Sequence, residues 1–463
     1  MNHLKEKKES YFQVDTGDEK LSFIKLCWPL VMEYILKYML TTVNTLILSG
    51  YSDDAVAAVG VAGQVTNLNF VIQQALSAGA MVSISQNLGA GNKKRAKNLA
   101  SVVLAMTVGV TALFTLLATL FPMQILRIMN LEERLLKEGA DYLAIVGTVA
   151  ILESLIAIIS AIVRCYGYTK IPMVIITVMN LINAIGSYIV IERPFEVPVY
   201  GVQGVAIARA ISVVASFILA LFIIRKVPLG LSFSAFKKEN EPGANVKILL
   251  KIGVPSGLSS FSYNFSQLIA TSILADMGSA SVSAMVYVKN IVQYVAICSM
   301  AISAAYQIIV GRVIGMGKKA YAKALGNMNF VLCAAFNTIV ILTIVLFRRP
   351  LVAMFTESPQ IMGLAVNVIV IDIVVEFFRA MNHAGSANLA ASGDVKYHMI
   401  IGIVSCWVFS VAFSYIFGVV LELGIYGCWM AFCLDEGFRA ISYCRRWQSG
   451  KWERFAVVKR DVQ

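Results

Sequence analysis

The chain has 463 residues, of which 58% are hydrophobic and 14% are charged. A soluble domain carries about 25% charged residues, so this composition excludes an ordinary water-soluble protein and indicates a surface that faces lipid. The formal net charge of +12 is compatible with nucleic-acid binding, but the positions of the basic residues argue against it.

Twelve apolar stretches follow one another along the chain, and each is long enough for a membrane helix, which needs about 20 residues. They lie near 26–49, 55–88, 98–121, 141–163, 170–191, 201–224, 248–275, 282–312, 324–347, 361–390, 398–420 and 424–444. An even number of spans places both termini on one side of the membrane. The sequence therefore predicts an all-α integral membrane protein.

The two halves of the chain repeat each other at a constant offset of 226 residues. The string LGAGNKKRA ends at Ala96 and its counterpart IGMGKKAYA ends at Ala322, and Pro29 likewise matches Pro255. Such a long-range repeat indicates two homologous lobes. We expect an N-terminal tail at 1–20, an N-lobe at 21–226, a polar linker at 227–245, a C-lobe at 246–450 and a C-terminal tail at 451–463. The first tail is expected to be flexible.

The basic residues lie mostly on the side of the termini. Of 39 lysines and arginines, 28 fall in the tails and in the loops on that side, and six fall in the opposite loops. This bias is the positive-inside pattern, which predicts cytoplasmic termini in a multi-pass protein of the cell membrane. The basic excess is thus a topology signal, so we expect a lipid bilayer and no nucleic acid as partner. The first twenty residues are polar, so we expect no cleavable signal peptide before the first span.

No pattern in the sequence indicates an enzyme, a cofactor or a metal site. The eight cysteines include no C-x-x-C pair, and the histidines His383 and His398 are too far apart for a local ligand motif. Phosphate-binding and hydrolase motifs are absent. The glycines of LGAGNKKRA follow a membrane span, so we expect them to form a tight turn and not a phosphate loop.

Charged residues inside the spans are the main functional candidates, because a charge in the membrane is costly. Glu33 and Lys37 lie one helical turn apart, as do Asp372 and Glu376, and Arg379 follows Glu376 by three residues. Each group has two interpretations: a self-neutralising structural clasp, or a carboxylate that binds the transported ion. Further charges within spans are Glu153, Arg209, Lys289, Asp435, Glu436 and Arg439, of which the pair Asp435 and Arg439 is interpreted as structural.

Polar neutral residues accompany these charges in spans 1, 2, 5, 7 and 8. Their density exceeds what helix packing needs, which favours a polar cavity between two rocking repeats. Such an arrangement is typical of secondary transporters, although the major facilitator architecture satisfies the same description.

The chain resembles the multidrug and toxic compound extrusion (MATE) family, within the multidrug/oligosaccharidyl-lipid/polysaccharide exporter superfamily. The strings that carry the resemblance are AVAAVG (55–60), NLGAGNKKRA (87–96), RCYGYTKIPM (164–173), GVQGVAIA (201–208), KIGVPSG (251–257), EFFRAMN (376–382), ASGDVK (391–396) and RRWQSGKW (445–452). The resemblance implies twelve helices in two six-helix lobes around a V-shaped central cleft. It also implies export of small amphipathic, often cationic compounds in exchange for H⁺ or Na⁺.

The sequence departs from the family at its usual ion site. Asn44 and Ser187 occupy the positions of two expected aspartates, Asn183 matches an expected asparagine, and Arg209 replaces an expected threonine. Tyr263 stands nearest to a glutamate of a family variant. We hypothesise that Arg209 substitutes for the coupling cation in the N-lobe, paired with Glu33.

The candidate coupling residues are therefore Glu33, Asp372 and Glu376. The candidate cavity and substrate contacts are Lys37, Asn44, Asn183, Ser187, Arg209, Tyr263, Lys289 and Arg379. Three functions stay open: an ion-coupled drug exporter, acting as a monomer; a lipid-linked precursor flippase or an exporter of an anionic or zwitterionic metabolite; and a sensor that does not transport.

Overall fold

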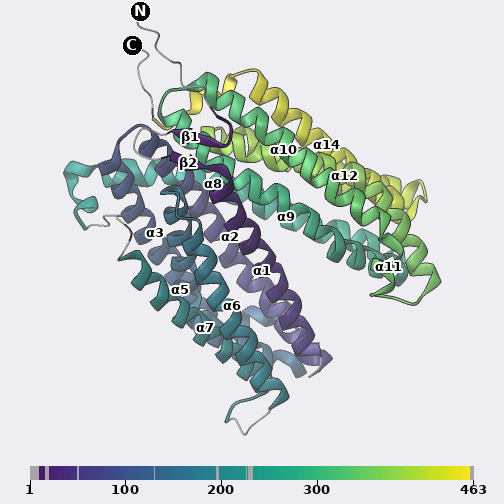
Figure 1. Cartoon of the computed structure of the whole chain (residues 1–463). Helices are drawn as coiled ribbons and strands as arrows, with labels where there is room; N and C mark the ends of the chain where they lie inside the picture. The colour runs from purple at the N-terminus through teal and green to yellow at the C-terminus, as the bar shows by residue number, and fades with distance from the viewer. Residues whose placement is uncertain are drawn as a thin grey trace, which may run out of the picture. The chain divides into compact units, whose positions relative to one another are not determined.

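The computed structural model describes residues 10–15, 20–49, 52–129, 131–193, 198–225, 227 and 233–458, and within them the side chains of 41–46, 48, 49, 53, 233 and 234 lie outside the description. The described chain is almost entirely helical (Figure 1). Its long helices are α1 (Phe23–Ser49), α2 (Asp53–Gly89), α3 (Lys93–Leu120), α5 (Glu133–Cys165), α6 (Lys170–Glu192), α7 (Gly201–Ile224), α8 (Pro242–Ala275), α9 (Ser279–Gly315), α10 (Lys319–Leu346), α12 (Pro359–Ser392), α13 (Val395–Ser405) and α14 (Gly424–Gln448).

Shorter elements connect or extend these helices. The π-helical stretches η3 (Cys406–Phe413) and η4 (Ile416–Val420) continue α13, and together they form the eleventh long segment. The others are α4 (Pro122–Ile128), α11 (Arg348–Ala353), the 3₁₀ turns η1 (Phe233–Phe236), η2 (Lys238–Asn240) and η5 (Lys451–Phe455), and the strands β1 (Gln13–Asp15) and β2 (Lys20–Ser22). Each predicted span coincides with one long helical segment, which confirms the all-α architecture.

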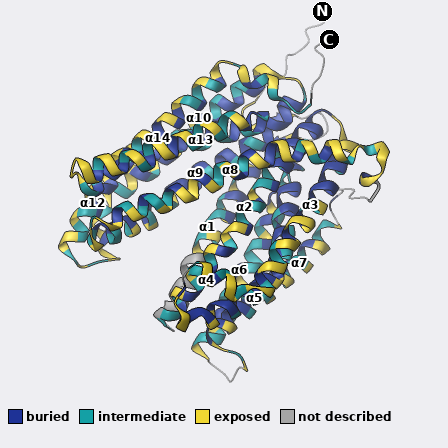
Figure 2. Cartoon of the chain, turned by 180° about the vertical axis from the view of Figure 1, so that it is seen from behind, coloured by how far each residue is buried: buried dark blue, intermediate teal, exposed yellow. Residues whose placement is uncertain are grey.

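Length and composition make nine helical segments of the described chain capable of crossing a membrane. Their outer faces are apolar, as lipid requires: on α7, Ile211, Ile218 and Phe222 are 56%, 61% and 61% exposed. Figure 2 shows such exposed positions alternating with buried ones along the helices. The chain is therefore a multi-pass membrane protein.

The residues group into two compact units. Unit 1 comprises Met1–Val31, Ser85–Gly91 and Pro255–Gln463, and unit 2 comprises Met32–Ile84 and Asn92–Val254. Three boundaries fall inside α1, α2 and α8, and one falls between α2 and α3, whereas the lobe boundaries expected from the sequence lie in the linker. Two of these boundaries fall close to the matched prolines Pro29 and Pro255.

Each unit has its own apolar core. In unit 1, one buried cluster joins α8, α9, α10, α11, α12 and α14, with Trp429 and Phe432 of α14 among its largest members. In unit 2, one cluster joins α2, α3, α4, α5 and α7, and a smaller one joins α5, α6 and α7. Helix α5 is more enclosed than α2, α3, α6 and α7, since 61% of the residues in its most apolar stretch are buried.

The repeated glycine motif has two roles. Gly91 and Gly317 adopt φ values of 79° and 82°, which favour glycine, and thereby form the predicted tight turns before α3 and α10. Gly89 and Gly315 instead allow close packing of helices within unit 1. A Cβ atom on Gly89 would overlap the carbonyl oxygen of Arg312, and one on Gly315 would overlap that of Gln86.

Both predicted tails contain ordered structure. Strand β1 pairs antiparallel with β2, and Tyr321 and Tyr306 donate hydrogen bonds to the carbonyl oxygens of Ser10 and Tyr11. At the other terminus, Trp452 is fully buried and stacks on Trp447 with 4.2 Å between ring centroids. Between the halves, α8 already begins at Pro242, inside the predicted linker.

We predict that Gly89→Ala lowers the melting temperature of the detergent-solubilised protein. The added methyl group meets backbone and not a flexible side chain, and overpacking of this kind costs about 1–3 kcal/mol. Gly60→Ala is the matched control on the same helix. A Cβ atom there meets nothing within 4 Å, so the alanine should be neutral or stabilising. Equal melting temperatures for the two variants would contradict the close crossing.

Candidate functional site

Unit 2 contains a cluster of five charged side chains within its helices. We call Glu33, Lys37, Glu153, Arg164 and Arg209 the unit 2 charge cluster. Arg164 at the end of α5 forms an ion pair with Glu33 of α1. Arg209 of α7 donates from Nη2 to Glu153 Oε1 of α5 at 3.1 Å. Both carboxylates of the cluster are thus matched by a guanidinium group.

Two pairings expected from the sequence differ from those observed. Arg209 pairs with Glu153 and approaches the hydroxyl of Tyr142 at 3.4 Å, and not Glu33. Glu33, expected to pair with Lys37 on its own helix, pairs with Arg164 instead. A guanidinium offers a planar set of donors for a carboxylate, which a lysine ammonium does not.

Lys37 interacts electrostatically with members of both ion pairs. Its ammonium group stands 4.2 Å from the ring centroid of Phe70 and interacts electrostatically with Glu33, Arg164 and Glu153. The cluster therefore forms one connected set of alternating charges, with three cations and two carboxylates.

Helix α6 carries Ser187, which stands where the resemblance leads to an aspartate, and Asn183, which matches an expected asparagine; both are enclosed. Asn183 and Ser187 of α6 are 3% and 0% exposed, and Asn183 Oδ1 and Ser187 Oγ have no hydrogen-bond partner among the described residues. The neighbouring Asn180 donates to the carbonyl oxygen of Leu36 at 2.9 Å. The side chain of Asn44 lies outside the described residues.

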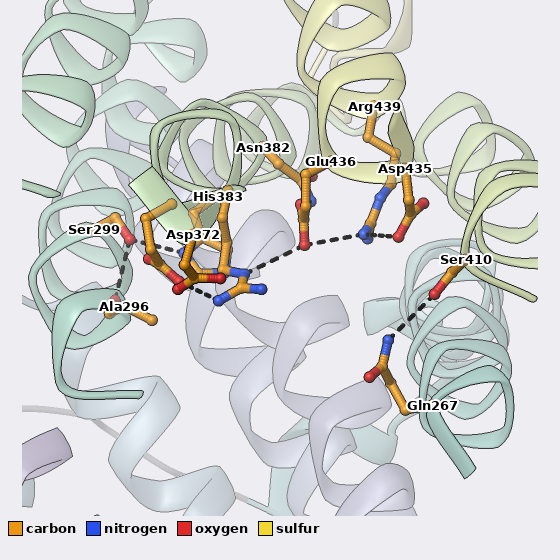
Figure 3. A network of polar contacts seen from close by, with 12 residues as sticks. Gln267, Ala296, Ser299, Asp372, Asn382, His383, Ser410, Asp435, Glu436 and Arg439 are labelled. Atoms are coloured by element: carbon orange, nitrogen blue, oxygen red, sulfur yellow. Dashed lines mark hydrogen bonds and ion pairs between the residues drawn. The ribbon is translucent and has the colours of Figure 1, made fainter. Parts of the chain in front are cut away.

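Unit 1 contains a larger set of ionisable groups on α12 and α14, shown in part in Figure 3. Its members, which we call the unit 1 charge network, are Asp372, Glu376, Arg379, Asp435, Glu436 and Arg439. Both arginines reach Glu436, with Nε of Arg379 at 3.4 Å and Nη2 of Arg439 at 3.1 Å from Oε1. Asn382 donates to the other oxygen of Glu436 at 2.7 Å. Glu436 therefore connects the two arginines.

The remaining contacts of the network follow the expected helical spacing. Arg379 forms an ion pair with Glu376, three residues earlier on α12. Arg439 pairs with Asp435, four residues earlier on α14, at 2.6 Å. Asn337 of α10 donates to Glu376 Oε2 at 3.2 Å. These pairs have the clasp geometry that the sequence predicts.

Asp372 differs from the other acids of the network. It is 1% exposed, and its Oδ1 accepts a hydrogen bond from the indole N–H of Trp429 at 3.0 Å. Its Oδ2 is buried without a hydrogen-bond partner among the described residues. Among the described residues, Asp372 therefore has a hydrogen bond from an indole and an electrostatic interaction with Arg379, but no ion pair.

The unit 1 charge network contains more carboxylates than cations. Four carboxylates share two guanidinium groups. Lys289 adds one more cation nearby, where its ammonium lies 3.4 Å from Gln267 Oε1. Even with Lys289 counted, one carboxylate is in excess.

Other polar groups lie close to the network. Gln267 donates to Ser410 of η3 at 3.5 Å, and the ring of Tyr263 lies 5.6 Å from the guanidinium of Arg439. The hydroxyl of Ser299 lies 2.9 Å from Nδ1 of His383 (Figure 3). In the described chain, no group of three or more His, Cys, Asp and Glu residues is arranged to hold a metal ion.

Each unit also presents a polar stripe at matched positions of the repeat. On α2, Gln64 and Asn67 are exposed; on α9, Asn290 is exposed and Gln293 partly so. The two pairs are related by the offset of 226 residues. Because amide side chains are costly against lipid, these stripes indicate faces that contact water.

Sequence reasoning missed several partners. It named Glu153 without a partner, assigned Arg164 only to membrane topology, and did not single out Asn337 or Trp429 for the acids of α12. A lone asparagine or tryptophan inside an apolar span is the available signal, since a buried polar group needs a partner.

Comparisons with known proteins agree with this architecture. The family model MatE matches residues 29–189 and 255–416. The uncharacterized transporter YisQ of Bacillus subtilis is 35% identical over 439 residues, which cover 94% of this chain and 96% of YisQ. A probable multidrug resistance protein NorM of Thermotoga maritima is 29% identical over 446 residues, which cover 95% of this chain and 94% of that protein.

Solved structures share the fold. An outward-facing multidrug resistance MATE family transporter of the MOP superfamily superposes with a TM-score of 0.85 at 20% identity, covering 93% of this chain and 96% of its own. A MOP superfamily transporter of Pyrococcus furiosus superposes with a TM-score of 0.84 at 20% identity, with the same coverage. The binding pocket of that protein is described as having reverse polarity that suggests a different function.

We predict that Arg439→Leu strongly destabilises the protein. Its side chain is 9% exposed and those of Asp435 and Glu436 are 3% and 5% exposed. The change therefore leaves buried Asp435 without a guanidinium and leaves Glu436 with Arg379 alone. Breaking a buried pair in this way costs about 3–5 kcal/mol. The measurement is unfolding of the detergent-solubilised protein.

Arg445→Leu is the matched control, because Arg445 lies on the same helix and is exposed. Adding Asp435→Asn to Arg439→Leu should recover part of the loss by removing the orphaned charge. An Arg439→Leu variant as stable as the control would show that the network contributes nothing to stability.

Proposed function

The chain belongs to the MatE family of membrane transporters, and we propose that it exports small amphipathic organic compounds by antiport with protons. In this proposal the protein alternates its access between the two sides of the membrane. The positive-inside distribution of basic residues supports cytoplasmic termini, so export runs away from the side of the termini.

The surroundings of the Asp372 carboxyl group are the main support for coupling to protons. An ionised carboxylate in an apolar interior needs a cation or several hydrogen bonds. Asp372 has one hydrogen bond from Trp429 and a second oxygen without a described partner, and Glu376 lies one turn away on the same helix. A proton on Asp372 neutralises its charge and also reduces repulsion with Glu376.

The rest of the network supports an exchangeable proton. Glu376, Asp435 and Glu436 each contact a guanidinium, so their ionised forms are already compensated. The excess carboxylate is therefore assigned to Asp372, with Glu376 as the group to which the proton can move. Two carboxylates that are close together do not readily ionise at once, which is a basis for exchange.

Unit 2 is a poorer candidate for the coupling site. Its two carboxylates, Glu33 and Glu153, each bind a guanidinium, and the positions of the usual aspartates hold Asn44 and Ser187. In this unit Arg209 provides a fixed positive charge beside Glu153. We therefore no longer favour Glu33 as a coupling residue, and we assign coupling to unit 1.

We predict that Asp372→Asn and Glu376→Gln abolish transport driven by a proton gradient. The purified protein is reconstituted in proteoliposomes, a proton or a sodium gradient is imposed, and one cationic and one anionic dye are followed. Both substitutions nearly keep the size of the side chain but remove its ability to exchange a proton. Glu33→Gln is measured beside them as the test of unit 2. Glu133→Gln is the matched control, because Glu133 is an exposed acid outside both charge sets, and it should keep gradient-driven transport.

Three results would count against this proposal. Transport driven only by sodium would exclude the proton, and loss of coupling in Glu33→Gln alone would move the site to unit 2. No dye movement with either gradient would contradict antiport and favour the flippase alternative. Melting temperatures of the variants separate loss of coupling from loss of folding.

A further inference from the structure

The unit 2 charge cluster has no role in the proton coupling assigned to unit 1. Its five charges alternate in sign from Arg164 through Glu33, Lys37 and Glu153 to Arg209. Among the described residues, three positive charges of the cluster face two negative ones, which leaves one net positive charge. A charge of this kind within the membrane attracts a mobile anion.

The cluster is accessible on a face that does not contact lipid. On α7, Arg209 precedes the lipid-facing Ile211 by two residues, which places it about 160° around the helix from that residue. Its side chain is nevertheless 29% exposed, and that of Glu153 on the enclosed helix α5 is 27% exposed. Lys37 is exposed as well. Water and solutes can therefore reach the positive groups.

The surroundings of the cluster suit an organic molecule. The aromatic rings of Phe70 and Tyr142 stand beside Lys37 and Arg209. Rings next to cations offer apolar area to the body of a ligand while the cations bind its charged group.

We propose that unit 2 selects substrates carrying an oxyanion, above all a carboxylate, and that Lys37 and Arg209 bind this group. The proposal rests on the exporter function proposed above and names its substrate class. A purely cationic substrate is disfavoured here, because it would add to an existing positive excess. Glu153 competes with the substrate for Arg209 and thereby keeps binding reversible.

The test uses two dyes that differ only in a carboxylate: rhodamine B and its ethyl ester. Their binding to the full-length, detergent-solubilised protein is measured by fluorescence polarisation without any ion gradient. The wild-type protein should bind the free acid about tenfold more tightly than the ester, which corresponds to one modest charge interaction. The control, Arg225→Gln, removes an exposed charge from the end of α7 and should change neither affinity.

Two variants are expected to shift acid binding in opposite directions. Lys37→Gln removes the excess charge and should weaken binding of the acid about tenfold, with the ester unchanged. Glu153→Gln removes the competing carboxylate and should strengthen binding of the acid severalfold. A purely structural role of the cluster predicts no gain for Glu153→Gln.

The proposal is overturned if the wild-type protein binds the ester as tightly as the acid, or if neither wild type nor Glu153→Gln binds the acid. It is also overturned if Glu153→Gln weakens acid binding while its melting temperature is unchanged. These outcomes are independent of coupling: selective acid binding without gradient-driven transport would contradict only the proposed antiport.

Discussion

The cost of placing a charge within a membrane is the constraint on which this structure depends. In the unit 2 charge cluster, each carboxylate is neutralised by a guanidinium from another helix. Glu33 pairs with Arg164, and Glu153 pairs with Arg209. These pairs join α1 to α5 and α5 to α7. In unit 1 the same constraint is met less completely, because Arg379 and Arg439 serve a larger number of acids.

In our proposal, this difference separates the two repeats in function. They share an offset of 226 residues, the turns at Gly91 and Gly317, and water-facing stripes at matched positions of α2 and α9. Their internal charges have opposite excess, positive in unit 2 and negative in unit 1. An ancestral duplication thus provides two similar scaffolds, of which one is suited to hold a proton and the other to attract an anion.

Much of the fold could be predicted from the sequence, because its signals are local or periodic. The span positions follow from runs of apolar residues, the turns follow from glycines in a repeated motif, and the pairs Glu376–Arg379 and Asp435–Arg439 follow from helical spacing. The contacts that determine the chemistry are tertiary. Glu33 binds Arg164 across 131 positions, and Asp372 binds Trp429 across 57.

No periodicity indicates such partners, so the candidate site could be predicted only as a list of charged residues. The prediction that Arg209 pairs with Glu33 was wrong for this reason: it chose among acids by family position, whereas packing brings α7 against α5 and places Glu153 in reach. The role of Gly89 could not be predicted from the sequence either. A glycine is required both at a close helix crossing and in a tight turn, so its presence does not distinguish the two.

The most direct test of the account is the protonation state of Asp372 at neutral pH. Infrared difference spectroscopy between the wild-type protein and Asp372→Asn reports the carbonyl stretching band of a protonated carboxyl group. The account predicts that this band is present in the wild type, absent in the variant, and reduced when the pH is raised. A wild-type spectrum in which Asp372 contributes only carboxylate bands would contradict the assignment of the exchangeable proton to unit 1.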